Sequence, residues 1–268
     1  MQEHAVAHAV QEAASHAEAH AELPNLVTLL KNLFPDAGWT RFLQQWENVL
    51  FSAVAAFFIV SVGIHAARKK NIIPVGIQNF CEIFAEGIEA FVTGILGERG
   101  RPYVPFLGTV FIYILLMNWS GLIPLMKSST ASWSTTLALA LTVMVYVQSI
   151  GIREQGLPHY LKHIAGNPSN LFGIVLIPLM LVINLTIEFI AVPLSLSLRL
   201  FANVSSEDKL LFKFAELNVL FKGLPFLFQL FANILAIAFS LVQAFVFMLL
   251  STVYISLVLP HEEHGHAH

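Results

Sequence analysis

Three ionisable residues, Glu188, Arg199 and Asp208, lie in or beside an apolar stretch long enough to cross a membrane. Ionisable groups at membrane depth are rare and mark functional pathways. Arg199 is the most informative, because it stays charged at physiological pH and costs at least about 2.5–3.5 kcal/mol to insert. We expect a partner's carboxylate or a water-filled cavity to offset this charge. The alternative is an arginine that snorkels from a helix end, but the sequence stays apolar through Val204.

Helical spacing predicts which residues share the face of Arg199. Ser195 and Asn203 are one turn away on either side, and Glu188 lies about 20° off the same face. Along the axis, Glu188 is about 16 Å toward one side of the membrane and Asp208 about 13 Å toward the other. On an ideal helix Asp208 points away from Arg199, so we expect it to face another helix or to follow the helix end.

The last apolar stretch carries Gln243 almost at its midpoint, with Gln229 and Asn233 toward its outer end. A fixed cation at mid-depth would then have polar groups on both sides. A continuous water path would short-circuit a membrane, whereas a fixed positive charge between two half-length polar paths blocks the passage of cations. We therefore predict two half-paths separated by Arg199, with Arg199 and Gln243 close together.

The composition indicates the elements that position these residues. Of 268 residues, 56% are hydrophobic and 12% are charged, where soluble domains have about 25% charged residues. This excludes a soluble globule, a disordered chain and a nucleic-acid-binding protein. The single cysteine, Cys81, excludes an internal disulfide framework and a thiolate metal cluster. The fold class is therefore an all-α integral membrane protein in a lipid bilayer.

Five stretches are long and apolar enough to span a bilayer, which takes about 20 residues. They form a membrane domain over residues 46–260, with predicted spans at about 46–67, 102–126, 128–152, 171–206 and 224–259. The last two exceed the hydrocarbon thickness of about 30 Å, so we expect a strongly tilted helical hairpin.

Residues 72–97 are predicted to form an amphipathic helix instead of a sixth span. Glu82, Glu86 and Glu89 share one face at helical spacing. The opposite face is apolar: Ile73, Ile77, Phe80, Phe84, Ile88, Phe91 and Ile95. We expect this helix to lie flat at the cytoplasmic membrane interface, or alternatively to pack on the protein's own surface.

The two ends of the chain are polar. Residues 1–45 form an N-terminal tail and pre-membrane segment, and residues 261–268 a His-rich tail. Four histidines, at positions 4, 8, 16 and 20, have a spacing that suits a metal, but a solvated helical tail is the favoured interpretation. Arg68, Lys69 and Lys70 follow the first span, which predicts an N-terminus outside and a cytoplasmic C-terminus.

Three motifs in separate spans resemble one family. The stretch IEFIAVPLSLSLRLFAN (Ile187–Asn203), followed by Asp208, closely resembles the signature of the a subunit of F-type ATP synthases. The segments LVQAFVFMLLSTVYISL (Leu241–Leu257) and FIYILLMNWSGLIP (Phe111–Pro124) resemble the same family. The resemblance covers roughly residues 45–260.

The resemblance implies a membrane stator subunit that passes protons to and from a rotating ring of c subunits. Arg199 would face the essential ring carboxylate. Asn203, Asp208 and Gln243 match residues of the half-channel on the outer side, and Glu188, with Ser195 nearby, would serve the cytoplasmic side. Ala236 departs from the family pattern, because some members carry a channel histidine there.

The implied partners are the c-subunit ring, b-type peripheral stalk subunits and the rest of the complex, without nucleic acid. The implied location is a bacterial plasma membrane, with an organellar energy-coupling membrane as the alternative. We expect no cofactor, metal or nucleotide site, since the chain has no Walker-type phosphate-binding run. The competing functions are a secondary transporter with a mid-membrane substrate site, which predicts paired broken helices and a repeat, and a structural or assembly membrane protein.

Overall fold

The computed structural model describes residues 25–34, 38–68, 76–123, 125–156, 158, 160, 171–220 and 226–259. These residues form helices joined by short connections, and the all-α membrane fold is confirmed. Five helical stretches are long and apolar enough to cross a membrane. The helices that supply them are α4 (Glu47–Arg68), α6 (Val104–Ser120), α7 (Trp133–Gln155), α9 and α10 (Leu171–Thr186 and Val192–Leu220) and α11 (Phe226–Val258).

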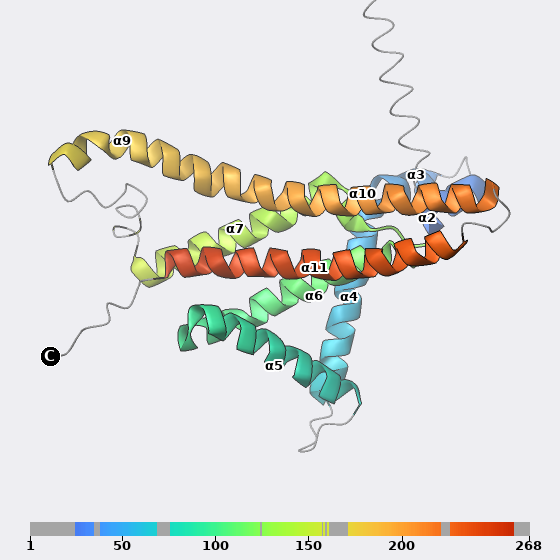
Figure 1. The fold of residues 1–268 in the computed structure, drawn as a ribbon, viewed down its shortest axis with the longest axis horizontal. Coiled ribbons are helices and arrows are strands. Elements are labelled where there is room, and N and C mark those ends of the chain that lie inside the picture. Colours follow the sequence, from blue (N-terminus) through green and yellow to red (C-terminus); the bar gives the residue numbers. More distant parts are fainter. Residues whose placement is uncertain are drawn as a thin grey trace, which may run out of the picture.

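The helices α10 and α11 run side by side as a long hairpin, which crosses α4 at a steep angle (Figure 1). The 33 residues of α11 correspond to a length of about 50 Å at 1.5 Å per residue. That exceeds a hydrocarbon core of about 30 Å, as the sequence predicted. The helix α10 continues without a break to Leu220, past residue 206, where the fourth span is predicted to end, so this end of the span stays a prediction.

The connection between the helices α6 and α7 is longer than the single residue that separates the predicted spans ending at 126 and beginning at 128. The helix α6 ends at Ser120, and α7 begins only at Trp133 after the short 3-10 helix Ser129–Ala131. Hydroxyl groups hold this connection by bonding to nearby polar groups: Ser120 Oγ donates to the Lys127 carbonyl at 2.9 Å. An irregular backbone that satisfies its own polar groups is tolerated beside a membrane domain.

The core of the protein lies between the hairpin and the two helices behind it. In this core α7 packs mainly against α10, and α6 mainly against α11. Its fully buried apolar side chains come from all four helices: Leu107, Ile114, Met117, Val143, Leu200, Phe247, Met248 and Ile255. This packing fixes one face of the hairpin and leaves the opposite face open.

The amphipathic segment forms α5 (Ile77–Leu96), and its residues before position 76 lie outside the described part of the chain. Its second half packs on the protein's own helices through Ile88 and Val92, which are buried. Its first half leaves Phe80 and Ile83 exposed. The alternative of packing on the protein's own surface therefore applies to its second half, and its position at a membrane interface stays a prediction.

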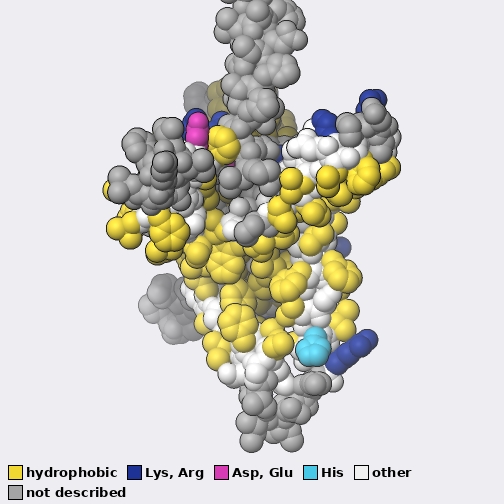
Figure 2. Space-filling model, turned by 90° about the vertical axis from the view of Figure 1, so that its right-hand side faces the viewer, with side chains coloured by type: hydrophobic (Ala, Val, Ile, Leu, Met, Phe, Trp, Pro, Cys, Tyr) yellow, Lys and Arg dark blue, Asp and Glu magenta, His cyan; other side chains and the backbone are white. Residues whose placement is uncertain are grey.

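The exterior suits a lipid environment. On the face shown in Figure 2, hydrophobic side chains form a broad band, and most charged side chains lie toward its two ends. The helix α4 contributes much of the exposed apolar surface, and its Phe57 side chain is 74% exposed. A large apolar surface of this kind requires lipid or a protein partner to cover it.

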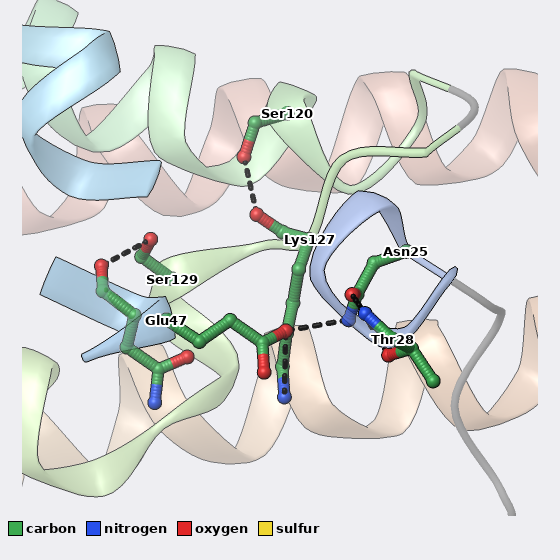
Figure 3. A network of polar contacts seen from close by, with 7 residues as sticks. Asn25, Thr28, Glu47, Ser120, Lys127 and Ser129 are labelled. Atoms are coloured by element: carbon green, nitrogen blue, oxygen red, sulfur yellow. Dashed lines mark hydrogen bonds and ion pairs between the residues drawn. The ribbon is translucent and has the colours of Figure 1, made fainter. Parts of the chain in front are cut away.

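Before α4 the chain forms two short helices, α2 (Leu26–Leu33) and α3 (Gly38–Gln45), which the sequence analysis missed. A polar network ties the start of α2 to the membrane helices (Figure 3). Asn25 donates to Glu47 Oε1 at 2.5 Å, and Lys127 Nζ lies 3.9 Å from the same oxygen. The start of α2, the start of α4 and the connection after α6 are thus held together at one end of the molecule.

Candidate functional site

Arg199 lies on the open face of α10. Leu196 and Leu200 point into the core, whereas the side chains of Ser195, Arg199 and Asn203 are exposed along one face. The guanidinium of Arg199 makes no hydrogen bond or ion pair with any described residue. A charged group on an apolar helix that has no partner among the described residues marks a candidate functional site.

One turn from Arg199, two amides join the helices of the hairpin. Asn203 Nδ2 donates to Gln243 Oε1 at 2.6 Å, and Gln243 is only 5% exposed. The sequence predicted Gln243 beside Arg199; its hydrogen-bond partner is Asn203, on the same face of α10 as Arg199. A buried amide with a short hydrogen bond is fixed in orientation, because breaking that bond leaves a desolvated polar group unpaired.

One further turn along the hairpin, an acid follows the amide pair. Ser240 Oγ donates to Glu207 Oε1 at 3.2 Å, and Glu207 is half-buried. The pairs 203–243 and 207–240 are successive rungs of an antiparallel contact, four and three residues apart on the two helices. We call these four residues the amide–acid ladder. The sequence analysis missed the role of Glu207, since helical phase within α10 does not reveal which residues face α11.

Beyond the ladder the contact becomes apolar. Ala236, at the position where some relatives carry histidine, is buried in a small cluster with Leu211 and Ala232. No polar group at position 236 extends the ladder, so Glu207 is the acid that it presents.

Asp208 points elsewhere. Its Oδ1 lies 3.3 Å from the position that a Cβ on Gly121 would take, in the connection after α6. The helix does not end before Asp208, and its carboxylate lies beside the connection after α6 and not beside another helix, so neither of the two predicted alternatives holds as stated. Gly121 is also 2.9 Å from the Ser128 Cβ by the same measure, so this connection leaves no room for a side chain at Gly121.

On the other side of Arg199, Glu188 lies in a π-helical turn (Ile187–Ala191). The turn has a local cause. Pro193 has no N–H to bond the carbonyl of Phe189, and the chain compensates with a wider turn in which the Val192 N–H bonds the Ile187 carbonyl. Such turns change the direction of side chains and are frequent at functional sites.

Two donors from outside this helix reach the carboxylate of Glu188. Gln148 Nε2 and the Tyr160 hydroxyl both donate to Oε2, at 3.3 and 3.4 Å. Burial raises the pKa of the Tyr160 phenol, and the Glu188 carboxylate raises it further. Sequence reasoning identified neither donor, because both are more than 25 residues from Glu188 along the chain.

A cavity adjoins Glu188. It has room for about 60 Å³ of water, and its lining includes Val143, Gln148, Glu188, Leu196, Tyr254 and Leu257. A site for one water needs roughly 10–15 Å³ on this measure, so several waters fit. Gln148 Oε1 is buried without a hydrogen-bond partner in the structure, and water in the cavity would supply one.

The polar sites therefore lie on both sides of Arg199. The carboxylate of Glu188 is eleven residues before it, about 16 Å along an ideal helix, and Glu207 is eight residues after it, about 12 Å. Between them lies the exposed guanidinium. A path for ions through this chain would be interrupted at Arg199 and would have to continue on a partner.

Comparison with known proteins gives the family. The family model described as "ATP synthase A chain" matches residues 49–256. The chain belongs to this family. It is 42% identical to ATP synthase subunit a of Protochlamydia amoebophila over 243 residues, which cover 88% of this chain and 89% of that protein. It is 38% identical to ATP synthase subunit a of Solidesulfovibrio magneticus, covering 80% and 85% of the two chains.

The resemblance to subunit a of F-type ATP synthases is thus confirmed. Membership makes the chain an integral membrane component of an ATP synthase complex with a role in proton transport. The relatives are bacterial, which agrees with a bacterial membrane. The two His-rich tails lie outside the described residues, so a metal there stays untested. Within the part of the chain that the structure describes, no cluster of potential metal ligands occurs.

Proposed function

We propose that this chain is the stator subunit that passes protons to and from the carboxylates of a rotating c-subunit ring, through two offset half-channels that Arg199 separates. The observation that carries the proposal is the exposed, unpartnered guanidinium of Arg199 between two polar sites. A ring carboxylate is the partner that this charge requires. Beside the guanidinium that carboxylate is favoured in its ionised form, which promotes proton release.

The outer half-channel runs along the hairpin. It comprises Asn203, Glu207 and Gln243, with Asp208 at its outer end beside the connection after α6. Two acids and two amides offer both titratable and water-ordering groups, which proton transfer over several ångströms requires. Glu207 and Ser240 compensate for the absence of a histidine at position 236.

The inner half-channel ends at Glu188. The cavity beside the carboxylate supplies room for water, and Ser195 continues the polar face from Glu188 toward Arg199. The apolar side chains that line the rest of the cavity exclude other polar paths. Protons reach the cytoplasm on this side, and the N-terminus lies outside with the C-terminus inside.

In this function the chain houses no nucleotide chemistry. It couples ion flow to rotation, while b-type peripheral stalk subunits hold it still and the rest of the complex makes ATP. Part of the exposed apolar surface of α4 and α5 then faces stalk helices and lipid.

Side-specific thiol labelling tests the two half-channels. In a Cys81→Ser background, a cysteine at position 188 should react with a membrane-impermeant reagent only from the cytoplasmic side of sealed vesicles, and one at position 207 only from the outer side. Phe57→Cys, on the lipid-facing surface of α4, should react from neither side. Reaction of positions 188 and 207 from the same side would overturn the assignment.

A further inference from the structure

Tyr160 lies between α7 and α9, outside the membrane-length helices, yet it is only 4% exposed. Its ring packs against the backbone of Gly151 on α7. A Cβ at Gly151 would lie 2.8 Å from Cε2 of the ring and 3.4 Å from the Cβ of Val258. The absence of a side chain at Gly151 is therefore what makes room for the tyrosine.

Two further hydrogen bonds fix the backbone of Tyr160 and the helix ends near it. Its backbone N–H donates to the Gly156 carbonyl at 3.0 Å, and Gln155 Nε2 donates to the Val258 carbonyl at 2.6 Å. The second bond fixes the end of α11 against the end of α7. Val258 also lines the cavity beside Glu188, so this corner borders the cavity.

The hydrogen bonds to Glu188 are asymmetric. Tyr160 and Gln148 both donate to Oε2, and Oε1 accepts no hydrogen bond from any described residue. A carboxylate whose one oxygen is held by two donors takes up a proton more readily on the other, because Oε2 has already used lone pairs on its donors.

We propose that Tyr160 is a positioning residue of the inner half-channel: with Gln148 it holds Oε2 of Glu188, so that Oε1 exchanges protons with water in the cavity. This inference rests on the proposed function of Glu188. In each transfer Oε1 accepts a proton from a hydronium ion in the cavity, which becomes water. It later releases the proton to a water molecule. Tyr160 keeps its own proton throughout, because burial raises the pKa of its phenol and leaves it a hydrogen-bond donor.

Removing the hydroxyl should make ionised Glu188 less stable. Two donors stabilise the charged form of the carboxylate, and Tyr160→Phe removes one of them. The titratable groups around Glu188 are Tyr160 from the segment after α7 and Tyr254 from α11, and no described cation pairs with it. We therefore expect the acidic limb of the cytoplasmic pH profile of proton pumping to move to higher pH in Tyr160→Phe.

The test uses the complete ATP synthase in sealed vesicles and measures ATP-driven proton pumping as the cytoplasmic-side pH varies. Tyr160→Phe keeps the ring contact with Gly151 and should assemble normally, while its profile shifts upward. The matched control is Tyr146→Phe, whose ring stacks on Phe106 with centroids 3.6 Å apart and whose hydroxyl bonds no described residue. Its profile should coincide with that of the unaltered protein.

Two further variants separate the possible failures. Glu188→Gln should remove the acidic limb, and adding Tyr160→Phe to it should cause no further change, because the tyrosine acts through the glutamate. A normal profile for Glu188→Gln would contradict the proposed function itself. An impaired Glu188→Gln with an unshifted Tyr160→Phe, or a double variant worse than Glu188→Gln, would overturn only the role of Tyr160.

Discussion

Glu207 and Asp208 are neighbours in sequence, but their side chains leave α10 in different directions. Glu207 reaches Ser240 on α11, and Asp208 reaches the connection beside Gly121. Of the two acids, only Glu207 lies in line with Arg199 and with the hydrogen-bonded pair of Asn203 and Gln243. Among the two acids, Glu207 therefore has the more direct place in the proposed outer half-channel.

We predict that Glu207→Gln slows ATP-driven proton pumping at least roughly tenfold, because an amide cannot relay a proton as a carboxylate does. Asp208→Asn should have the smaller effect. The control is Glu216→Gln, also on α10, whose exposed carboxylate pairs with Lys213 at 2.9 Å and should be dispensable. Normal pumping by Glu207→Gln together with a larger loss in Asp208→Asn would reverse this order.

Periodicity within one helix was enough to propose three residues of the candidate site. Arg199, Asn203 and Glu188 were recognisable because a charge or amide inside an apolar run is costly and recurs at helical spacing. Glu207, Gln148 and Tyr160 were missed because their importance depends on contacts between elements far apart in the sequence. A glutamate beside an aspartate and a lysine looks like a solvated helix end until the helix is seen to continue.

At the scale of elements, the ends of helices were the least predictable feature. Hydrophobic length correctly gave five spans and two over-long helices. It failed where polar residues lie inside a helix, as in α10 beyond Ser206, and where apolar residues lie in a turn, as in residues 121–126. Hydropathy measures the preference for lipid, whereas the end of a helix depends on local hydrogen bonds.

The packing of α7 against the loop that follows it gives an element-scale prediction. Gly151→Ala should displace Tyr160 and so reduce pumping several-fold, because the new methyl group would overlap the ring at 2.8 Å. Gly63→Ala on α4 is the matched control, since its Cβ would meet no atom within 4 Å. Pumping would be normalised to the amount of assembled complex.

Equal pumping by the two glycine variants would show that Tyr160 does not depend on Gly151. A loss of assembled complex in Gly151→Ala alone would instead indicate that this contact serves stability.

At the scale of the whole molecule, the chain has a site that is incomplete by itself. Its core fixes one face of the α10–α11 hairpin and leaves Arg199 on the other. On the face that Figure 2 shows, hydrophobic side chains form a broad exposed band, which requires lipid or protein partners to cover it. The family explains this incompleteness, because a subunit of a rotary complex acts only on its neighbours.

The central claim is that Arg199 keeps the two half-channels apart, and one measurement tests it most directly. Proton flux and ATP synthesis are recorded together in vesicles that carry the complex and an imposed pH gradient. We predict that Arg199→Ala lowers the rate of ATP synthesis at least roughly 100-fold, which corresponds to a free energy of about 2.7 kcal/mol. At the same time, protons should leak through the assembled complex. Arg199→Ala vesicles that hold the gradient and make ATP at the normal rate would contradict the account.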